Sequence, residues 1–403
     1  MKQAKKFLGD VICSISAIVL LNGVLQLVVY PLISRRISSE AFGNVLYIQA
    51  LLSIFAASLG SALNNTRLVM RSREGICSGD FFQSLLVLSF PALLAVLLLS
   101  FRHLESQINL ILLVVLFFLT ACKNYTDVEY RLSLQYHRYF LYYAVSTVGY
   151  LVGLGAFQKS GNWLLVFLVG EAAALFFGLY KGTVYRAPFQ HSPWRSKVLK
   201  NTFCLGASYM FYNAVVNLDR VMLTYVMGGE SVTIYYVASL MGKMIALVVG
   251  PLNSVAISYL SKDQGLTQKK LFALCGAAVL LGGCFYVAAQ IATPLYVRVM
   301  YPTLYEQAVP LSFAANLAQI LCFSGSLILT MVLTVCSAKW QLAVQGGYAV
   351  LYVGCAWIIS GTAWLEGFAW AAVAVGLLRL VAAMVLGLYF ASKSRRRKQD
   401  EAG

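Results

Sequence analysis

The stretch NAVVNLDRVMLTYVMGGESVTIYYVASLMGKMIALVVGPLNS, from Asn213 to Ser254, decides the fold. It contains two long apolar runs joined by a short turn at 228–230. Asp219, Arg220 and Lys243 lie inside or at the edges of these runs. A charge at the middle of a membrane helix costs roughly 2.5 to 3.5 kcal/mol on insertion scales. The stretch therefore predicts a helical hairpin whose charges face water, a partner charge or a substrate.

The composition of the whole chain is that of a membrane protein. Of its 403 residues, 60% are hydrophobic and 11% are charged, whereas about 25% of the residues of a soluble globular protein are charged. Apolar runs alternate with short polar breaks, which favours helices over a β-barrel. The nine cysteines are scattered and the three histidines lie apart. We therefore predict an all-α polytopic membrane protein with no disulfide framework, metal site or cofactor.

Twelve spans are predicted, because about 20 apolar residues cross a bilayer. Their approximate limits are 11–34, 43–66, 80–101, 107–131, 139–158, 163–185, 201–226, 232–260, 271–293, 308–335, 341–360 and 367–391. The longest break carries two prolines. We interpret it as a cytoplasmic linker (186–200) between an N-lobe (1–185, helices 1 to 6) and a C-lobe (201–392, helices 7 to 12), which a basic cytoplasmic tail (393–403) follows.

The distribution of positive charge predicts the orientation. With the N-terminus inside the cell, most of the 31 Lys and Arg residues fall in inner segments, and the positive-inside rule then places both termini in the cytoplasm. The outer segments hold only Arg35, Arg36, Arg102, Lys159, Arg220 and Arg298. The net charge of +16 is thus explained by topology and by contact with anionic lipid, without nucleic acid.

An internal repeat relates the first two spans to the seventh and eighth. At a nearly constant offset of 189 to 191 residues, Asn22 and Gln26 match Asn213 and Asn217, Glu40 matches Glu230, Gln49 and Ser53 match Ser239 and Lys243, and Gly60 matches Gly250. Each half holds six helices and therefore enters the membrane in the same sense. Such a parallel repeat is typical of transporters that rock two lobes around a central cavity.

Polar residues recur on one face of each central helix. Asn213, Asn217, Arg220 and Thr224 are spaced at i, i+4, i+7 and i+11, and Tyr236, Ser239 and Lys243 at i, i+3 and i+7. Two such stripes facing one another would line a wet cavity. No GxxxxGK[ST] phosphate loop occurs, so no ATPase is predicted.

Three segments resemble a known family. RRISSEAFGNVLY (35–47), DRVMLTYVMGGESVTIYY (219–236) and ATPLYVRVMYPTLYEQAV (292–309) are similar to the signature segments of bacterial polysaccharide-export flippases. These are the O-antigen (Wzx-type) translocases of the multidrug/oligosaccharidyl-lipid/polysaccharide (MOP) superfamily. The resemblance implies a flippase of the bacterial inner membrane that moves undecaprenyl-diphosphate-linked oligosaccharide to the outer leaflet, driven by an ion gradient or the membrane potential. It also implies a polysaccharide polymerase and chain-length machinery as partners.

Eight residues are predicted to bind this substrate: Arg35, Arg36, Asn213, Asn217, Arg220, Tyr236, Ser239 and Lys243. Arg35 and Arg36 either grip the diphosphate, for which a guanidinium offers a bidentate fork, or reach outer lipid headgroups. Lys243 is too deep to reach a headgroup with ease. We predict that it binds an anion, with a buried structural pair as the alternative.

Five further charged residues are candidates for ion coupling or for structural pairing: Glu171, Asp219, Arg379, Asp127 and Glu129. Asp219 is predicted as a structural partner or cap, whereas the sequence leaves the role of Glu171 and Arg379 open. The GxxxG pairs Gly149/Gly153 and Gly178/Gly182 predict close helix packing.

Three other functions compete with the flippase. A multidrug or other small-molecule exporter on the same fold would be expected to have an acidic or apolar cavity, whereas the deep charges here are mainly cationic. A membrane polysaccharide polymerase or ligase would be expected to carry a large outer loop with catalytic residues, and the chain lacks one. A membrane scaffold that transports nothing is the remaining alternative. We therefore predict no enzyme and no catalytic residue.

Overall fold

The computed structural model describes residues 2–70, 75–104, 106–185, 187–260, 268–332, 338–360 and 365–400, and these are helices and short turns without a strand. The first half contains α1 (Lys2–Val24), η1 (Leu25–Val29), α2 (Tyr30–Ser34), α3 (Ser39–Leu52), η2 (Ser53–Ala57), α4 (Ser58–Val69), α5 (Ser78–Ser100), η3 (Phe101–His103), α6 (Gln107–Thr126), α7 (Val128–Leu132), α8 (Tyr136–Ser160) and α9 (Leu164–Lys181). The second half contains α10 (Arg195–Val216), α11 (Leu218–Met227), α12 (Gly229–Leu260), α13 (Gln268–Met300), η4 (Pro302–Leu304), α14 (Tyr305–Val332), α15 (Ala338–Ser360) and α16 (Leu365–Asp400).

These elements join end to end into twelve rods within the described residues, one for each predicted span. Eight of the rods are long and apolar enough to cross a membrane, and Leu164–Tyr180 and Ala343–Ile359 are shorter apolar helices. The predicted all-α membrane fold is confirmed. The limits of some spans differ from the prediction, because α13 continues through Pro294 to Met300 instead of ending at 293.

A proline explains an irregular turn in the first rod. Pro31 has no N–H, and its ring would clash with the carbonyl one turn earlier. The backbone before it is π-helical in η1, where the N–H of Tyr30 donates to the carbonyl of Leu25. The second rod also contains a π-helical segment, η2, and the Ser58 hydroxyl donates to the Ser53 carbonyl there at 3.2 Å.

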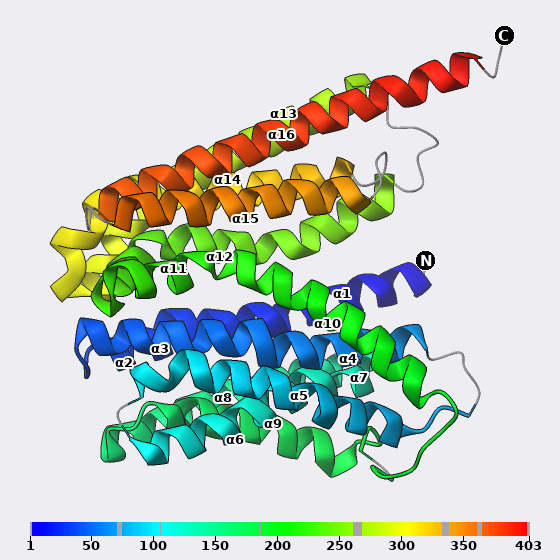
Figure 1. Cartoon of the computed structure of the whole chain (residues 1–403), viewed down its shortest axis with the longest axis vertical. Helices are drawn as coiled ribbons and strands as arrows, with labels where there is room; N and C mark the ends of the chain where they lie inside the picture. Colours follow the sequence, from blue (N-terminus) through cyan, green and yellow to red (C-terminus); the bar gives the residue numbers. More distant parts are fainter. Residues whose placement is uncertain are drawn as a thin grey trace. The chain divides into compact units, whose positions relative to one another are not determined.

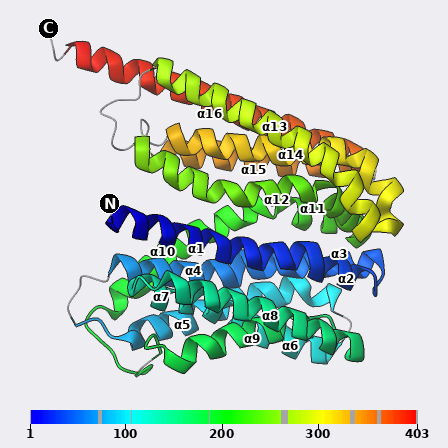
Figure 2. The same ribbon diagram turned by 180° about the vertical axis from the view of Figure 1, so that it is seen from behind.

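The chain divides into two compact units, Met1–Val221 and Met222–Gly403. In the first unit, α8 packs on α1 and α9, and α6 packs on α9 and α4. These rods lie side by side in Figures 1 and 2. α10 packs on α4 and α5 and so belongs to the first unit by its contacts. The division therefore falls inside α11, later than the predicted linker 186–200, and the predicted lobes 1–185 and 201–392 stay a prediction.

The segment that precedes α10 is bound to the ends of earlier helices. Asp80, in the first turn of α5, accepts hydrogen bonds from the Ser192 N–H at 3.0 Å and the Ser192 hydroxyl at 2.5 Å. Glu129, in α7, accepts the N–H of Thr183 at 2.9 Å. Arg67, in α4, donates to the Val184 carbonyl at 3.3 Å. Charged side chains thus satisfy loop amides and carbonyls, which holds this segment against the first unit.

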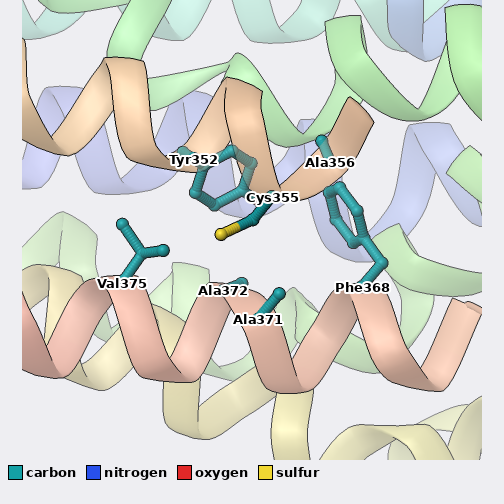
Figure 3. Close-up of a pocket in the computed structure, with 7 residues that line it drawn as sticks. All are labelled: Tyr352, Cys355, Ala356, Phe368, Ala371, Ala372 and Val375. Atoms are coloured by element: carbon teal, nitrogen blue, oxygen red, sulfur yellow. The ribbon is translucent and has the colours of Figure 1, made fainter. Parts of the chain in front are cut away.

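In the second unit, α14 is the central helix and packs on α12, α13 and α16. Its apolar core includes Cys275, Phe323, Ile328 and Leu380. Gly228, with φ of 83°, is the left-handed turn residue between α11 and α12. The predicted turn at 228–230 is thus shorter in the structure, because α12 already begins at Gly229. α15 packs on α16, and a narrow apolar crevice with no room for a water molecule lies between them (Figure 3). It is lined by Tyr352, Cys355, Ala356, Phe368, Ala371, Ala372 and Val375.

Candidate functional site

The strongest candidate site is a buried ionic network inside the first unit. Its centre is Lys123 of α6, whose Nζ lies 3.0 Å from Oε1 of Glu171 in α9. The hydroxyl of Tyr150, in α8, donates to the same Glu171 oxygen at 2.6 Å. Lys123 also donates to the Tyr150 oxygen at 3.1 Å. An acid, a base and a phenol from three helices therefore form one closed triangle.

The pair is buried, with side chains 6% and 9% exposed. Removing an ion from water costs several kcal/mol, and only a close, hydrogen-bonded partner offsets that cost. One acceptor remains unsatisfied, because Oε2 of Glu171 is buried without a hydrogen-bond partner.

Asp127 forms a second part of the network, at the turn between α6 and α7. Its Oδ1 accepts a hydrogen bond from the amide of Asn64, in α4. Its Oδ2 accepts the hydroxyl of Tyr143, in α8, at 2.8 Å. Arg131 donates to the Asn64 oxygen at 3.1 Å, so Asn64 connects the guanidinium with the carboxylate.

Helix periodicity connects the two parts. Lys123 and Asp127 are four residues apart on one rod, and Tyr143 and Tyr150 are seven apart on α8, so each pair lies on one helix face. The Lys123 ammonium lies 6.0 Å from the centre of the Tyr143 ring. This cation–π contact is the link between the Asp127 part and the Lys123–Glu171 triangle.

Small residues bring these helices close enough to form the network. A Cβ at Gly153 would lie 2.7 Å from the backbone of Val166 in α9, and one at Gly149 would lie 2.9 Å from Gly170. A Cβ at Gly178 would meet the Thr126 methyl at 2.4 Å. The predicted close packing at Gly149/Gly153 and at Gly178 is confirmed. The α8–α9 interface leaves no room for larger residues at these positions.

Lys123 and the tyrosines were not predicted from the sequence as site residues. Lys123 lies in the inner part of the predicted span 107–131 and is buried in α6. Tyr143 and Tyr150 are both buried and hydrogen-bonded to carboxylates. The sequence contains one sign of this pair. A lysine lies within the predicted span 107–131, and a glutamate lies within the predicted span 163–185.

The predicted polar stripe of the seventh span is not on one continuous helix. α10 ends at Val216, where the Asn217 amide donates to the Asn213 carbonyl at 2.9 Å. A side chain that bonds to its own helix in this way competes with the helical hydrogen bonds. The Asn213 amide donates to the Ser58 hydroxyl at 2.7 Å. In this structure, Asn213 thus connects α10 with α4, and Asn217 lies where α10 ends. Their role in substrate binding stays a prediction.

The neighbouring charges have different environments. Asp219 is buried in the first turn of α11, where its Oδ1 accepts the N–H of Arg220 at 2.9 Å. Arg220 is half-buried. Arg35 and Arg36 are exposed in the turn after α2. Glu129 holds Thr183 and lies outside the Lys123–Glu171 triangle.

In the second unit, the predicted stripe on α12 lies on one face. The Lys243 ammonium is 5.7 Å from the centre of the Tyr236 ring, two turns earlier. Ser239 is buried, and its hydroxyl donates to the Tyr236 carbonyl at 3.3 Å. Arg379, in α16, is buried and donates to Ser326 and to the carbonyl of Cys322 in α14. No group of three metal-ligating side chains occurs among the residues that were placed.

Comparison with known proteins assigns the fold. The sequence matches no protein-family profile and no curated protein. The structure is similar to a multidrug resistance MATE family transporter of the MOP superfamily in its inward-facing conformation, with a TM-score of 0.66, 16% identity and coverage of 96% of each chain. Its outward-facing conformation matches with a TM-score of 0.58 and 15% identity, again over 96% of each chain. A MATE in complex with MaL6 matches with a TM-score of 0.64 and 14% identity, over 96% of this chain and 97% of the other.

These similarities show that the chain has the MATE fold over nearly its whole length. The neighbours are transporters and not enzymes. The chain accordingly has the fold of these transporters and is a multi-pass membrane protein.

Proposed function

We propose that the chain is a flippase that moves an undecaprenyl-diphosphate-linked oligosaccharide from the inner to the outer leaflet of the bacterial cytoplasmic membrane. Both termini would lie in the cytoplasm, and a polysaccharide polymerase would receive the product. The observation that carries this proposal is the sign of the charges within the membrane helices of the second unit. The transmembrane rods of the second unit contain Lys243 and Arg379 but no acidic residue between Ser231 and Leu260, between Gln307 and Val332, or between Gly367 and Phe390. Such an interior suits an anionic head group.

The membrane potential supplies enough energy for this step. Moving one charge through 100 mV is worth about 2.3 kcal/mol. A diphosphate with roughly two negative charges therefore gains about 4.6 kcal/mol when an inside-negative potential of 100 mV drives it outward. ATP hydrolysis is not required by this balance.

The network around Glu171 is the candidate for coupling transport to protons. Protonation of Glu171 would release Lys123 and Tyr150 from their shared acceptor, which changes the interactions among α6, α8 and α9. Ion coupling requires a part of the protein that has two alternative states. The protonated and ionised forms of Glu171 would provide them.

A multidrug exporter is the second candidate, because the first solved neighbour is named as a multidrug resistance transporter. The two candidates predict different cargo.

The full chain is reconstituted in vesicles that carry a fluorescent polyprenyl-diphosphate oligosaccharide in one leaflet, and in parallel vesicles loaded with a cationic dye. Potential-dependent movement of the lipid without dye efflux supports the flippase. Dye efflux without lipid movement would replace it with the exporter.

A further inference from the structure

The segment between α9 and α10 forms a strap across the ends of α4, α5, α6 and α7. We define the strap as residues 182–185 and 187–194. The hydroxyl of Tyr185 lies 3.0 Å from the Thr126 hydroxyl, and it donates to the Cys122 carbonyl at 3.3 Å, at the end of α6. The contacts with α4, α5 and α7 are those that hold the segment before α10, as described for the fold. The strap is therefore a fixed part of the first unit.

The strap packs closely on the first turns of α5. A Cβ at Gly79 would lie 2.2 Å from the carbonyl oxygen of Gln190. The ring of Phe82 lies 6.0 Å from the Tyr185 ring and 6.3 Å from the Phe189 ring, each in an edge-to-face arrangement. Because these contacts already order the strap, a partner that binds it has little ordering entropy to offset.

The position of Phe82 gives the depth of the strap in the membrane. The rod Ser78–His103 is a candidate span of 26 residues, or about 39 Å of helix. The hydrocarbon core is about 30 Å thick, so the first turns of this rod lie among lipid headgroups. Phe82 is in those turns, and Phe189 contacts it. The strap therefore lies at the level of the headgroups.

The outer face of the strap combines aromatic and cationic side chains. Phe189 is 74% exposed, although it lies in a connecting segment and not in a predicted span. Arg195, Lys197 and Lys200, in the first turns of α10, are exposed as well. The Lys197 ammonium lies 5.3 Å from the centre of the Trp194 ring. Aromatic rings beside Lys and Arg are typical of a membrane–water interface.

The charge of this face has a single sign. The sequence contains five Lys and Arg residues and no Asp or Glu within 172–218. Two acids of other helices contact the strap: Asp80 is buried and accepts hydrogen bonds from Ser192, and Glu129 accepts the N–H of Thr183. Both acids are thus occupied by the strap itself. The face matches an anionic partner, and its depth favours lipid over a soluble acidic protein.

We propose that the strap and the first two turns of α10 form a docking surface for anionic phospholipid. Phe189 inserts among the headgroups. Lys197 and Lys200, three residues apart on one face of α10, contact the lipid phosphates. With both termini in the cytoplasm, as proposed above, these lipids belong to the cytoplasmic leaflet. The surface lies wholly within the first unit, and it does not depend on the transported substrate.

Hydrogen exchange of the full chain in lipid nanodiscs tests this surface without any transported substrate. One set of discs contains phosphatidylcholine alone, and the other contains phosphatidylcholine mixed with phosphatidylglycerol. In peptides that cover the strap and the start of α10, the amides are expected to exchange at least threefold more slowly in the discs with phosphatidylglycerol. High salt should diminish this difference, because it screens exposed charges.

Two double variants separate the proposed surface from a general effect of charge. Lys197→Gln/Lys200→Gln removes two exposed charges of the surface and should abolish the difference between the two kinds of disc. The matched control Arg102→Gln/Lys159→Gln removes two exposed charges from other helix ends and should keep it. All four side chains are exposed, so both variants should fold. Unchanged exchange in peptides of α8 and α9 checks this expectation.

Three results would contradict the proposal. Equal exchange of wild type in the two kinds of disc would overturn it. A phosphatidylglycerol effect that Lys197→Gln/Lys200→Gln keeps in full would also overturn it. Slower exchange in α10 alone, with the amides of 187–194 unchanged, would exclude Phe189 and the strap from the lipid surface.

Discussion

The ammonium of Lys123 and the carboxylate of Glu171 are in contact at 3.0 Å, although 48 residues separate them in the sequence. The pair lies where α6, α8 and α9 meet, and Tyr150 completes it with a hydrogen bond of 2.6 Å to Glu171. Its burial means that each charge depends on the other for its stability.

Removal of one partner should therefore cost more than removal of both. Lys123→Met leaves a buried carboxylate without a cation and is expected to destabilise the protein by about 3 to 5 kcal/mol. The double variant with Glu171→Leu replaces the pair with apolar groups of similar volume and should recover most of that loss. Denaturation of the purified proteins in detergent measures both values. A double variant as unstable as Lys123→Met would show that the pair does not account for the effect.

Transport should lose its response to a proton gradient when Glu171 can no longer titrate. Glu171→Gln keeps the size and hydrogen-bonding oxygen of the side chain but stays neutral at every pH. In vesicles with an imposed pH gradient, this variant is expected to transport at the rate seen without a gradient. Glu129→Gln is the matched control, because Glu129 binds Thr183 and is outside the Lys123–Glu171 triangle. Equal gradient responses in wild type and Glu171→Gln would exclude Glu171 as the coupling residue.

Two glycines of α8 provide a sharp test of helix packing. Gly153→Ala places a Cβ 2.7 Å from backbone atoms of Val166 and is expected to cost about 1 to 3 kcal/mol, because α8 and α9 must separate. Gly155→Ala meets nothing within 4 Å and should be neutral or stabilising by up to about 1 kcal/mol, since alanine favours the helix. Thermal unfolding of the two variants gives the comparison. Similar losses for both would contradict the close approach of α8 and α9.

The contact between Asp80 and Ser192 should protect the segment before α10 from proteolysis. Asp80→Ala removes the acceptor of both hydrogen bonds from Ser192, one of them at 2.5 Å, and of the Cys77 N–H at the start of α5. Hydrogen bonds to charged groups contribute about 1.5 to 3 kcal/mol each, so local opening should become at least about tenfold more frequent. Trypsin cleavage near Arg195 and Lys197 in inside-out vesicles measures this opening. Glu40→Ala, an exposed acid at another helix start, serves as the control.

Cleavage in that experiment also reports the orientation of the chain. Protection of both proteins in inside-out vesicles, with cleavage in right-side-out vesicles, would reverse the proposed topology. Equal cleavage rates for wild type and Asp80→Ala would show that Ser192 is held by other contacts.

The cationic residues of the predicted stripes should affect transport and not insertion. Lys243→Ala and Arg220→Ala are expected to reduce the movement of a diphosphate-linked lipid at least tenfold, because each removes a positive charge from the predicted binding surface. Lys159→Ala removes an exposed lysine at the end of α8 and should have no effect. Protein levels in the membrane provide the control for insertion. Unchanged lipid movement in both variants would remove these residues from the substrate site.

Much of the architecture could be predicted from the sequence alone. In lipid, a chain must satisfy its backbone hydrogen bonds internally, so a long apolar run is almost always a helix. For this reason the twelve spans were predictable from composition, and the glycines at 149, 153 and 178 were correctly interpreted as packing positions. The turn at Gly228 was also visible, because a Gly-Gly pair between two apolar runs is typical of a tight connection.

The partners of the buried charges could be decided only by the tertiary structure. Lys123 follows an apolar run and precedes polar residues, like a lysine that marks the cytoplasmic end of a span, and only the packing of α6 against α9 places it beside Glu171. Arg379 likewise gives no sign in the sequence that its contacts in α14 are neutral. The hydropathy of the successive residues in one segment determines whether that segment crosses the membrane. Electrostatic pairing acts between helices, and it depends on which faces the packing brings together.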